Sequence, residues 1–346
     1  MIPGGLLLVN YAVKQAPSTI TKDEAVMSSG NAEPVARQYT SMDRGTHSLH
    51  ESRGPQDFCQ RFEVATGRSV QQVVDKVISS TAPRAVFVAG SLPLGMATSG
   101  SDVDLIVLVD SNAVLVNGES HIANNAQQLE FHNQNDALLA GIFLSMNEGV
   151  LVDLHVALTP TIHGIYRRLR GRGPELNETE IRTLGRINTG WLLWQSEGYL
   201  ERNPEVLRDP ALDVYCCTKH FVSALHEIAK AHRAVGCTDF TLALQLGRLA
   251  VELAYLAYFA SEGMPYLGSK WLAQIGHARG AAERVRRHPL LQEGSRLLFP
   301  VYTSNSRETN GYLQAVAEFL TAMRNLMEQK TLFRIAFQAC PQVHPL

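Results

Sequence analysis

Three aspartates are the residues of this sequence best suited to chemistry on a phosphate. Asp102 and Asp104 are one residue apart at the head of the apolar run Val103–Val109, and Asp153 lies in a later apolar run. Residues i and i+2 of an extended strand point to the same face, so Asp102 and Asp104 can converge on one ion. Carboxylate oxygens are the ligands that Mg²⁺ prefers. The spacing predicts a Mg²⁺ site held by Asp102 and Asp104, and Asp153 from another strand can complete a second metal site.

A Gly-Ser pair, Gly90 and Ser91, follows the apolar run Ala85–Ala89. Glycine lets a backbone approach a phosphate closely, and the Ser91 hydroxyl with the next backbone N–H groups, at a helix start, could hold the terminal phosphates. Phosphoryl-type transfer needs neutralised charge more than covalent help. Together with the three aspartates as catalytic residues, the pair predicts transfer of a nucleotide, in which Asp153 completes the second metal or accepts the proton of the attacking hydroxyl.

The order of these residues resembles the signature of the DNA polymerase beta-like nucleotidyltransferase superfamily. The stretches Val86–Gly95 and Gly100–Val107 are similar to those of kanamycin-type small-molecule nucleotidyltransferases. A Gly-Ser pair or an Asp-x-Asp pair alone is common, and the specificity comes from their combination in order. The resemblance implies an α+β nucleotidyltransferase fold, a mixed β-sheet with helices, followed by an all-helical C-terminal domain. It also implies ATP as the donor, Asp153 as the third carboxylate, and Ser101 beside the nucleotide.

The C-terminal half resembles that family more loosely. Lys270 and Trp271 follow the break at Pro265. Lys270 at a helix start could reach the triphosphate and is taken as nucleotide-binding, and the alternative is a solvated lysine beside a core tryptophan. Arg248 and Glu252 are spaced i and i+4 on a helix, so they either serve the site or form an intrahelical ion pair.

Several other polar residues stay open as candidates. Glu130 is a reserve carboxylate, and Asp153 could instead be a strand-end carboxylate bound to a neighbouring arginine. Lys219, His220 and His226 could face the site, although a histidine in a long helix is more often a surface or satisfied core residue.

The elements that must position these residues follow from the apolar periodicity. Helical spacing predicts a helix over 69–80, and β-rich runs predict strands over 85–89, 103–109 and 150–158, with a further strand over 128–132. Beyond Pro160 the pattern turns helical, and we expect helices over 178–197, 212–235, 241–261, 270–287 and 310–336. Trp191, Leu192 and Trp194 are expected in the core of the first of these.

A dense arginine run, Tyr166–Arg172, follows the last predicted strand. It could grip phosphate or a nucleic-acid acceptor, or be a solvated loop between domains. We favour the loop, because no series of aromatic residues for base stacking accompanies it.

Composition limits the partners. The chain has 31 Lys+Arg against 33 Asp+Glu and a pI near 6.6, so nucleic acid is not the expected partner. The run Gly5–Val9 is too short to span a membrane, so we expect no membrane association. Five cysteines match neither a zinc nor a disulfide pattern and are expected to be reduced thiols in a cytoplasmic protein. Charged residues make up only 18%, which leaves room for a homodimer interface.

These observations divide the chain into three parts. Residues 1–57 are expected to be a polar, flexible leader, with Met27 or Met42 as alternative true starts. Residues 58–165 form the catalytic domain and 166–346 the helical substrate-binding domain. The expected reaction transfers AMP from ATP to a hydroxyl or amine of a small molecule, releasing pyrophosphate. The alternatives are a nucleotidyltransferase that acts on tRNA or protein, and a catalytically idle nucleotide-binding module.

Overall fold

The computed structural model describes residues 52–77, 83–98, 101–110, 128–132, 139–145, 150–171, 175–206, 209–266 and 288–337. The predicted leader lies almost wholly outside this range. Helix α1 (Pro55–Thr66) begins within the last residues assigned to it.

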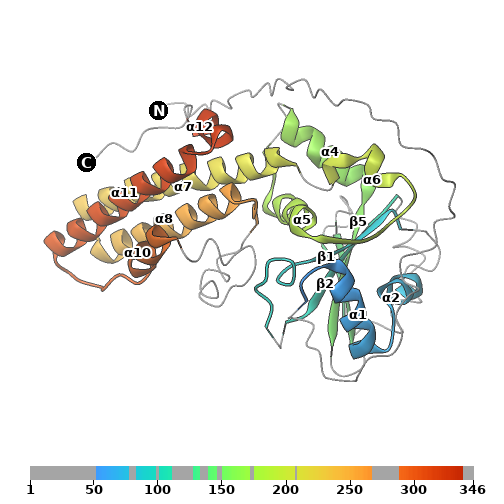
Figure 1. Ribbon diagram of the computed structural model, residues 1–346. Helices are drawn as coiled ribbons and strands as arrows, with labels where there is room; N and C mark the ends of the chain where they lie inside the picture. The colour runs from blue at the N-terminus through green and yellow to red at the C-terminus, as the bar shows by residue number, and fades with distance from the viewer. Residues whose placement is uncertain are drawn as a thin grey trace. The chain divides into compact units, whose positions relative to one another are not determined.

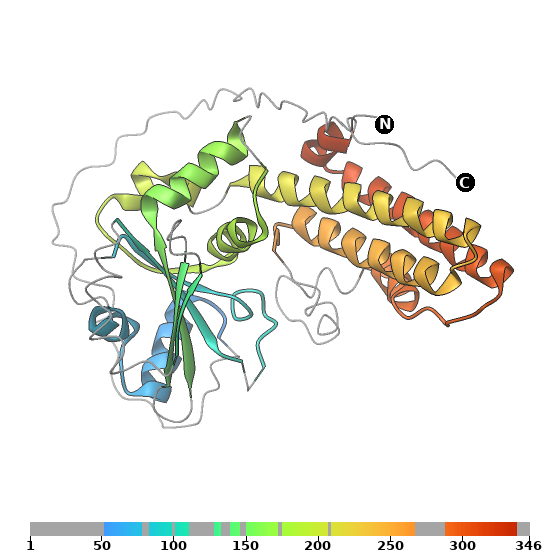
Figure 2. The ribbon, with the colours of Figure 1, turned by 180° about the vertical axis from the view of Figure 1, so that it is seen from behind.

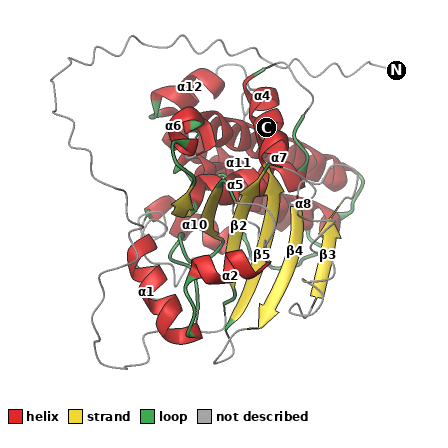
Figure 3. Cartoon of the chain, turned by 90° about the vertical axis from the view of Figure 1, so that its right-hand side faces the viewer, coloured by secondary structure: helices red, strands yellow, loops and turns green. Residues whose placement is uncertain are grey.

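A six-stranded mixed sheet carries the N-terminal half, with strand order β3-β4-β5-β2-β1-β6. Its strands are β1 (Ala85–Ala89), β2 (Val103–Val109), β3 (Gln128–His132), β4 (Leu139–Ser145), β5 (Leu151–Leu158) and β6 (Trp191–Gln195). The central pair β2 and β5 runs parallel, and the other neighbours are antiparallel. Figure 3 shows β2, β5, β4 and β3 side by side.

The sequence predicts the strands well where an apolar run is flanked by polar residues. The predictions for 85–89, 103–109 and 128–132 are confirmed, and the strand expected over 150–158 starts one residue later, at Leu151. Strand β4 was not predicted. A mixed α+β architecture is therefore confirmed.

Strand β6 corrects the prediction of a helix over 178–197. Helix α5 (Glu178–Thr189) ends where Gly190 takes an extended conformation, with ψ at 156°. A Cβ on Gly190 would lie 2.8 Å from the carbonyl oxygen of Val88, so only glycine fits this close passage beside β1. The Trp-Leu-Leu-Trp run that follows pairs with the free edge of β1 and is half-buried in a strand, where aromatic and branched residues fit better than in a helix.

The two faces of the sheet bury different sets of side chains. On one face, residues such as Val86, Leu105 and Leu154 pack with Phe58 of α1 and Val73 of α2 (Val70–Val77). The prediction of a helix over 69–80 is confirmed as far as Val77. On the other face, alternate strand residues pack against α4 (Thr159–Arg170), α5 and the helices beyond.

Helices make up the C-terminal half. After α6 (Tyr199–Arg202) and a 3₁₀ turn (Pro204–Val206) come the helices α7 (Pro210–Gly236), α8 (Phe240–Ser261), α10 (Pro289–Leu297), α11 (Ser306–Glu328) and α12 (Thr331–Phe337). Figures 1 and 2 show α7, α8 and α11 running alongside one another. The predictions of helices over 212–235 and 241–261 are confirmed, and that over 270–287 lies outside the described residues.

Three helical segments differ from the predictions. The helix expected over 310–336 is two helices, α11 and α12, which part after Glu328. Helix α10 was not predicted. The arginine run was expected in a loop, but it lies in α4 as far as Arg170, because the helix continues through Ile162, Ile165 and Tyr166, which bury one face.

Helix α8 is the one helix among the described residues that is long and apolar enough to cross a bilayer. Many of its residues, including Val251, Tyr255 and Phe259, are buried against other helices. The core helix of a soluble protein meets the same criteria of length and composition.

Candidate active site

Asp104 and Asp153 lie side by side on the two central parallel strands. The register pairs Asp104 of β2 with Asp153 of β5, and Ala89 of β1 with Asp104 from the other side. Since β1 ends where β2 and β5 begin, the three strands bring their ends to one edge of the sheet. Both carboxylates are buried, at 7% and 6% exposure. Two buried carboxylates this close require positive charge beside them.

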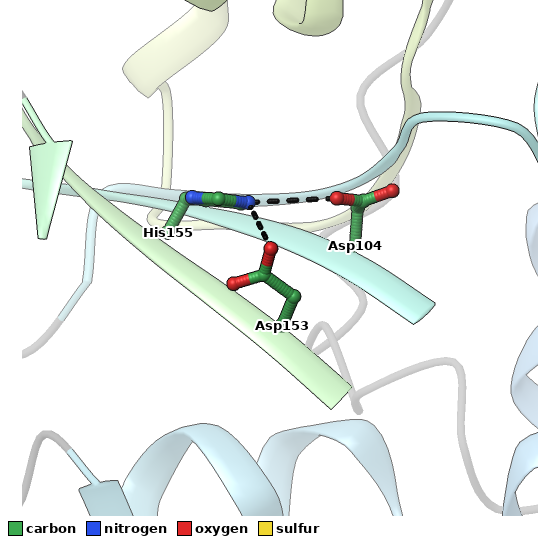
Figure 4. A group of neighbouring side chains, drawn as sticks. All are labelled: Asp104, Asp153 and His155. Atoms are coloured by element: carbon green, nitrogen blue, oxygen red, sulfur yellow. Dashed lines mark ion pairs between the residues drawn. The ribbon is translucent and has the colours of Figure 1, made fainter. Parts of the chain in front are cut away.

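His155 can supply part of that charge when its imidazole is protonated. It lies two residues after Asp153 on β5 and therefore on the same face. Its Nε2 atom is 2.8 Å from Asp153 Oδ2 and 3.4 Å from Asp104 Oδ1. Dashed lines in Figure 4 mark these two ion pairs. Ligand atoms of these three residues all lie within 4.8 Å of one another.

Arg186 of α5 completes the cluster. Its Nη1 atom lies 2.8 Å from His155 Nε2, and Nη2 lies 3.4 Å from Asp104 Oδ1. A capping box fixes the start of α5, in which the Asn177 side chain accepts from the Glu180 N–H and Glu180 accepts from the Asn177 N–H, both at 2.9 Å. Such a box satisfies two backbone donors that the first turn leaves open. The reach of Arg186 to the sheet therefore rests on a well-defined helix.

Opposing effects act on the pKa of the His155 imidazole. Burial lowers its pKa, but hydrogen bonds with Asp104 and Asp153 outweigh burial and the nearby Arg186 charge, so the pKa is raised above its usual value. A protonated Nε2 donates to Asp153. Because a guanidinium can only donate, Arg186 can hydrogen-bond to Nε2 only when that atom is unprotonated. Both a protonated His155 and Arg186 are directed at Asp104.

The backbone of Gly90 packs directly against the side chain of Asp104. Its φ of +70° lies in the left-handed region, and a Cβ there would lie 1.9 Å from Asp104 Oδ2. No side chain fits in that space. The described structure places Gly90 against a carboxylate of the site, and its approach to a phosphate stays a prediction.

Ser91 begins a turn and not a helix, which corrects the expected helix start. The Gly95 N–H donates to the Leu92 carbonyl at 3.0 Å and the Met96 N–H to the Ser91 carbonyl at 2.9 Å. Pro93 has no N–H to donate, and Gly95, with φ at +68°, turns the chain out of any helical path. Ser91 itself is buried at 3% exposure.

Asp102 and Ser101 lie just before β2, and both are half-buried. Ser101 Oγ accepts a hydrogen bond from the Thr98 N–H at 2.9 Å, so it closes the loop that leads from the Gly-Ser turn to the strand. Among the described residues, the close group of candidate metal ligands contains Asp104 and Asp153 but not Asp102.

The donor set suits a divalent cation. Asp153 Oδ1 and His155 Nδ1 are buried and have no hydrogen-bond partner within the described ranges. A buried polar atom left without a partner costs about 1–3 kcal/mol. The paired carboxylates with an unsatisfied oxygen could therefore hold a metal ion.

Candidates outside the cluster have partners of their own. Arg248 pairs with Glu252 at 3.0 Å and Lys219 with Glu175 at 2.8 Å. Burial, with a smaller effect of Lys219, lowers the pKa of His220 to about 4. Lys270, Trp271 and the side chain of Glu130 lie outside the described residues, so their proposed roles stay predictions.

The arginines of α4 are tied to neighbouring helices. Arg168 pairs with Glu180 of α5, and Arg170 pairs at 2.8 Å with Asp209, the N-cap of α7. These two charges connect helices. An acceptor-binding role for Arg168 or Arg170 would have to use a side chain that is already paired, whereas Arg167 of the same helix is exposed.

Sequence reasoning missed His155 and Arg186. For His155 the signal was present, because the alternation of the β5 run already placed it on the face of Asp153. For Arg186 there was none, since 31 residues separate it from His155 and only the packing of α5 brings them together.

Comparisons with known proteins establish no family. No family model and no curated protein matches the sequence. Among solved structures, the chain is similar to a nucleotidyltransferase-like protein from Exiguobacterium sibiricum 255-15, with a TM-score of 0.39 and 12% identity over 77% of each chain. A TM-score of this size does not establish a shared fold.

Proposed function

We propose that this protein transfers a nucleoside monophosphate, AMP from ATP, to a hydroxyl or amine of a small molecule in a Mg²⁺-dependent reaction. The observation that carries the proposal is the register of Asp104 with Asp153, two buried carboxylates on adjacent parallel strands. Gly90 leaves no space behind Asp104, which holds that carboxylate toward Asp153 and His155.

The residues divide the work as follows. Asp104 and Asp153 would hold the cation, with Asp102 as a further ligand from the loop before β2. When bound, Mg²⁺ neutralises charge on the triphosphate and on the departing pyrophosphate. The acceptor oxygen or nitrogen attacks the α-phosphorus, the bond to pyrophosphate breaks, and Asp153 takes the acceptor's proton.

A small-molecule acceptor is favoured by charge. The chain carries 31 Lys+Arg against 33 Asp+Glu, and Arg168 and Arg170 are paired with carboxylates. Nothing general in this balance attracts a polyanion. A cytoplasmic location is part of the proposal, because Cys59, Cys216 and Cys237 are not in disulfides, which fits a reducing compartment.

A second candidate is a nucleotide-binding module without turnover. It is favoured by the contacts of His155 and Arg186, which give the two carboxylates positive charge from within the chain. In that case, added Mg²⁺ would find its ligands already neutralised.

The test follows the nucleotide's α-phosphate. The full chain is incubated with Mg²⁺ and each NTP labelled at the α-phosphate, alone, with a small-molecule extract, with tRNA and with a protein fraction. Label in a small-molecule product supports the proposal. Label in tRNA or protein would show nucleotide transfer to that macromolecule and contradict the small-molecule acceptor. No transfer under any condition would leave the module without turnover as the better account.

A further inference from the structure

We propose that His155 is a direct metal ligand, and that the group Asp104, Asp153 and His155 binds Mn²⁺ or a similar transition-metal ion in preference to Mg²⁺. The inference rests on the proposed function for its biological use, but not for its geometry. It replaces the all-oxygen ligand set expected from the sequence with a mixed nitrogen and oxygen set.

The separations of His155 Nε2 from the two carboxylate oxygens are those of adjacent ligands around one metal ion. Metal–ligand distances near 2.1 Å place adjacent ligands of an octahedron roughly 3.0 Å apart and those of a tetrahedron roughly 3.4 Å apart. His155 Nε2 lies 2.8 Å from Asp153 Oδ2 and 3.4 Å from Asp104 Oδ1. Figure 4 shows Nε2 facing both carboxylates. With all ligand atoms of the group within 4.8 Å of one another, the three residues can approach a single ion.

The nitrogen donor determines which ion fits. Mg²⁺ is bound mainly by carboxylates, phosphates and water, whereas imidazole suits transition metals. Asp153 Oδ1, buried without a partner in the described part of the chain, offers a further oxygen. Removal of the imidazole should therefore weaken Mn²⁺ binding more than Mg²⁺ binding.

The positive charge of Arg186 disfavours the binding of any cation at this site. Its Nη1 atom lies 2.8 Å from the His155 nitrogen that would hold the metal. A bound ion must displace the Arg186 guanidinium from that nitrogen. Replacement of Arg186 by an uncharged residue also removes a positive charge that repels the ion. The two residues therefore predict different results: His155 sets the choice of metal, and Arg186 sets the strength of binding for all metals.

Calorimetric titration of the full chain with MnCl₂ and with MgCl₂, in the absence of nucleotide, measures this choice. We expect His155→Asn to lower the ratio of Mn²⁺ to Mg²⁺ affinity on the order of tenfold. Arg186→Gln is the matched control: it removes a positive charge beside the site and should strengthen both affinities without lowering the ratio of Mn²⁺ to Mg²⁺ affinity. An unchanged ratio in His155→Asn would overturn the proposal.

A spectroscopic measurement needs no variant. Electron spin echo measurements on the wild-type protein with Mn²⁺ should show coupling to an imidazole nitrogen, and labelling of histidine with ¹⁵N should change that coupling. Bound Mn²⁺ without nitrogen coupling would refute ligation by His155. Failure of nucleotide transfer with intact nitrogen coupling would refute the proposed function and leave this inference standing.

Discussion

The replacement of Gly90 by alanine tests the packing of the site most sharply. Gly90 has φ at +70°, and a Cβ would lie 1.9 Å from Asp104 Oδ2 and 2.8 Å from its Cγ. The left-handed conformation alone costs an alanine about 1–2 kcal/mol. Because Asp104 is fixed in β2, its carboxylate must rotate away from His155 and Arg186.

Gly198 provides a matched control for this cost. Its φ is +63°, and a Cβ there would meet only the flexible guanidinium end of Arg202 at 2.8 Å. Gly198→Ala therefore carries the conformational cost without the displaced carboxylate. We expect Gly90→Ala to lower the free energy of unfolding by about 2 kcal/mol more than Gly198→Ala, since displacement of one partner of a buried ion pair costs several kcal/mol.

Urea unfolding followed by circular dichroism measures both free energies. The Asp104→Ala background removes the carboxylate, so there the cost of Gly90→Ala should fall toward that of Gly198→Ala. Equal losses for Gly90→Ala and Gly198→Ala in the wild-type background would refute the close packing of Gly90 on Asp104.

Three further predictions concern the helical half. Burial lowers the pKa of His220 from 6.5 to about 4, so its contribution to stability is present above pH 6.5 and is lost as pH falls toward 4. Between pH 7 and 4.5, His220→Gln should lose about 2 kcal/mol less unfolding free energy than the wild type, and equal losses would contradict a half-buried neutral imidazole. Gly311→Ala, in the exposed second turn of α11 with nothing within 4 Å of the new Cβ, should raise stability by about 0.5–1 kcal/mol in the same assay. Gly247→Ala should instead lower stability by about 1–3 kcal/mol, because its Cβ would lie 2.7 Å from the Tyr312 ring, and a gain would contradict that contact.

The sequence predicted the strands that carry the site because their apolar runs are local signals. Val103–Val109 is buried along its whole length, and its polar flanks mark both ends. The prediction of a helix through Trp191 was wrong because the continuous apolar run there fits a helix and a strand equally well. The free edge of β1, a tertiary feature, decided between helix and strand.

The candidate site shows the same division. The aspartates and Gly90 follow from spacing, and the structure brings Asp104, Asp153 and Gly90 together. Asp102 lies before the start of β2, so the alternation of side chains along a strand does not determine where its carboxylate points. Arg186 reaches the cluster through the packing of α5, which no local pattern encodes.

Pyrophosphate release is the most direct test of the central claim that Asp104 and Asp153 perform nucleotide transfer. The comparison uses wild type, Asp104→Asn, Asp153→Asn and the control Asp110→Asn, whose exposed carboxylate pairs with Arg84 at the far end of β2. We expect divalent-cation-dependent release in wild type and Asp110→Asn, and a loss of roughly a hundredfold or more in both site variants. Unchanged release in Asp104→Asn or Asp153→Asn would contradict the claim.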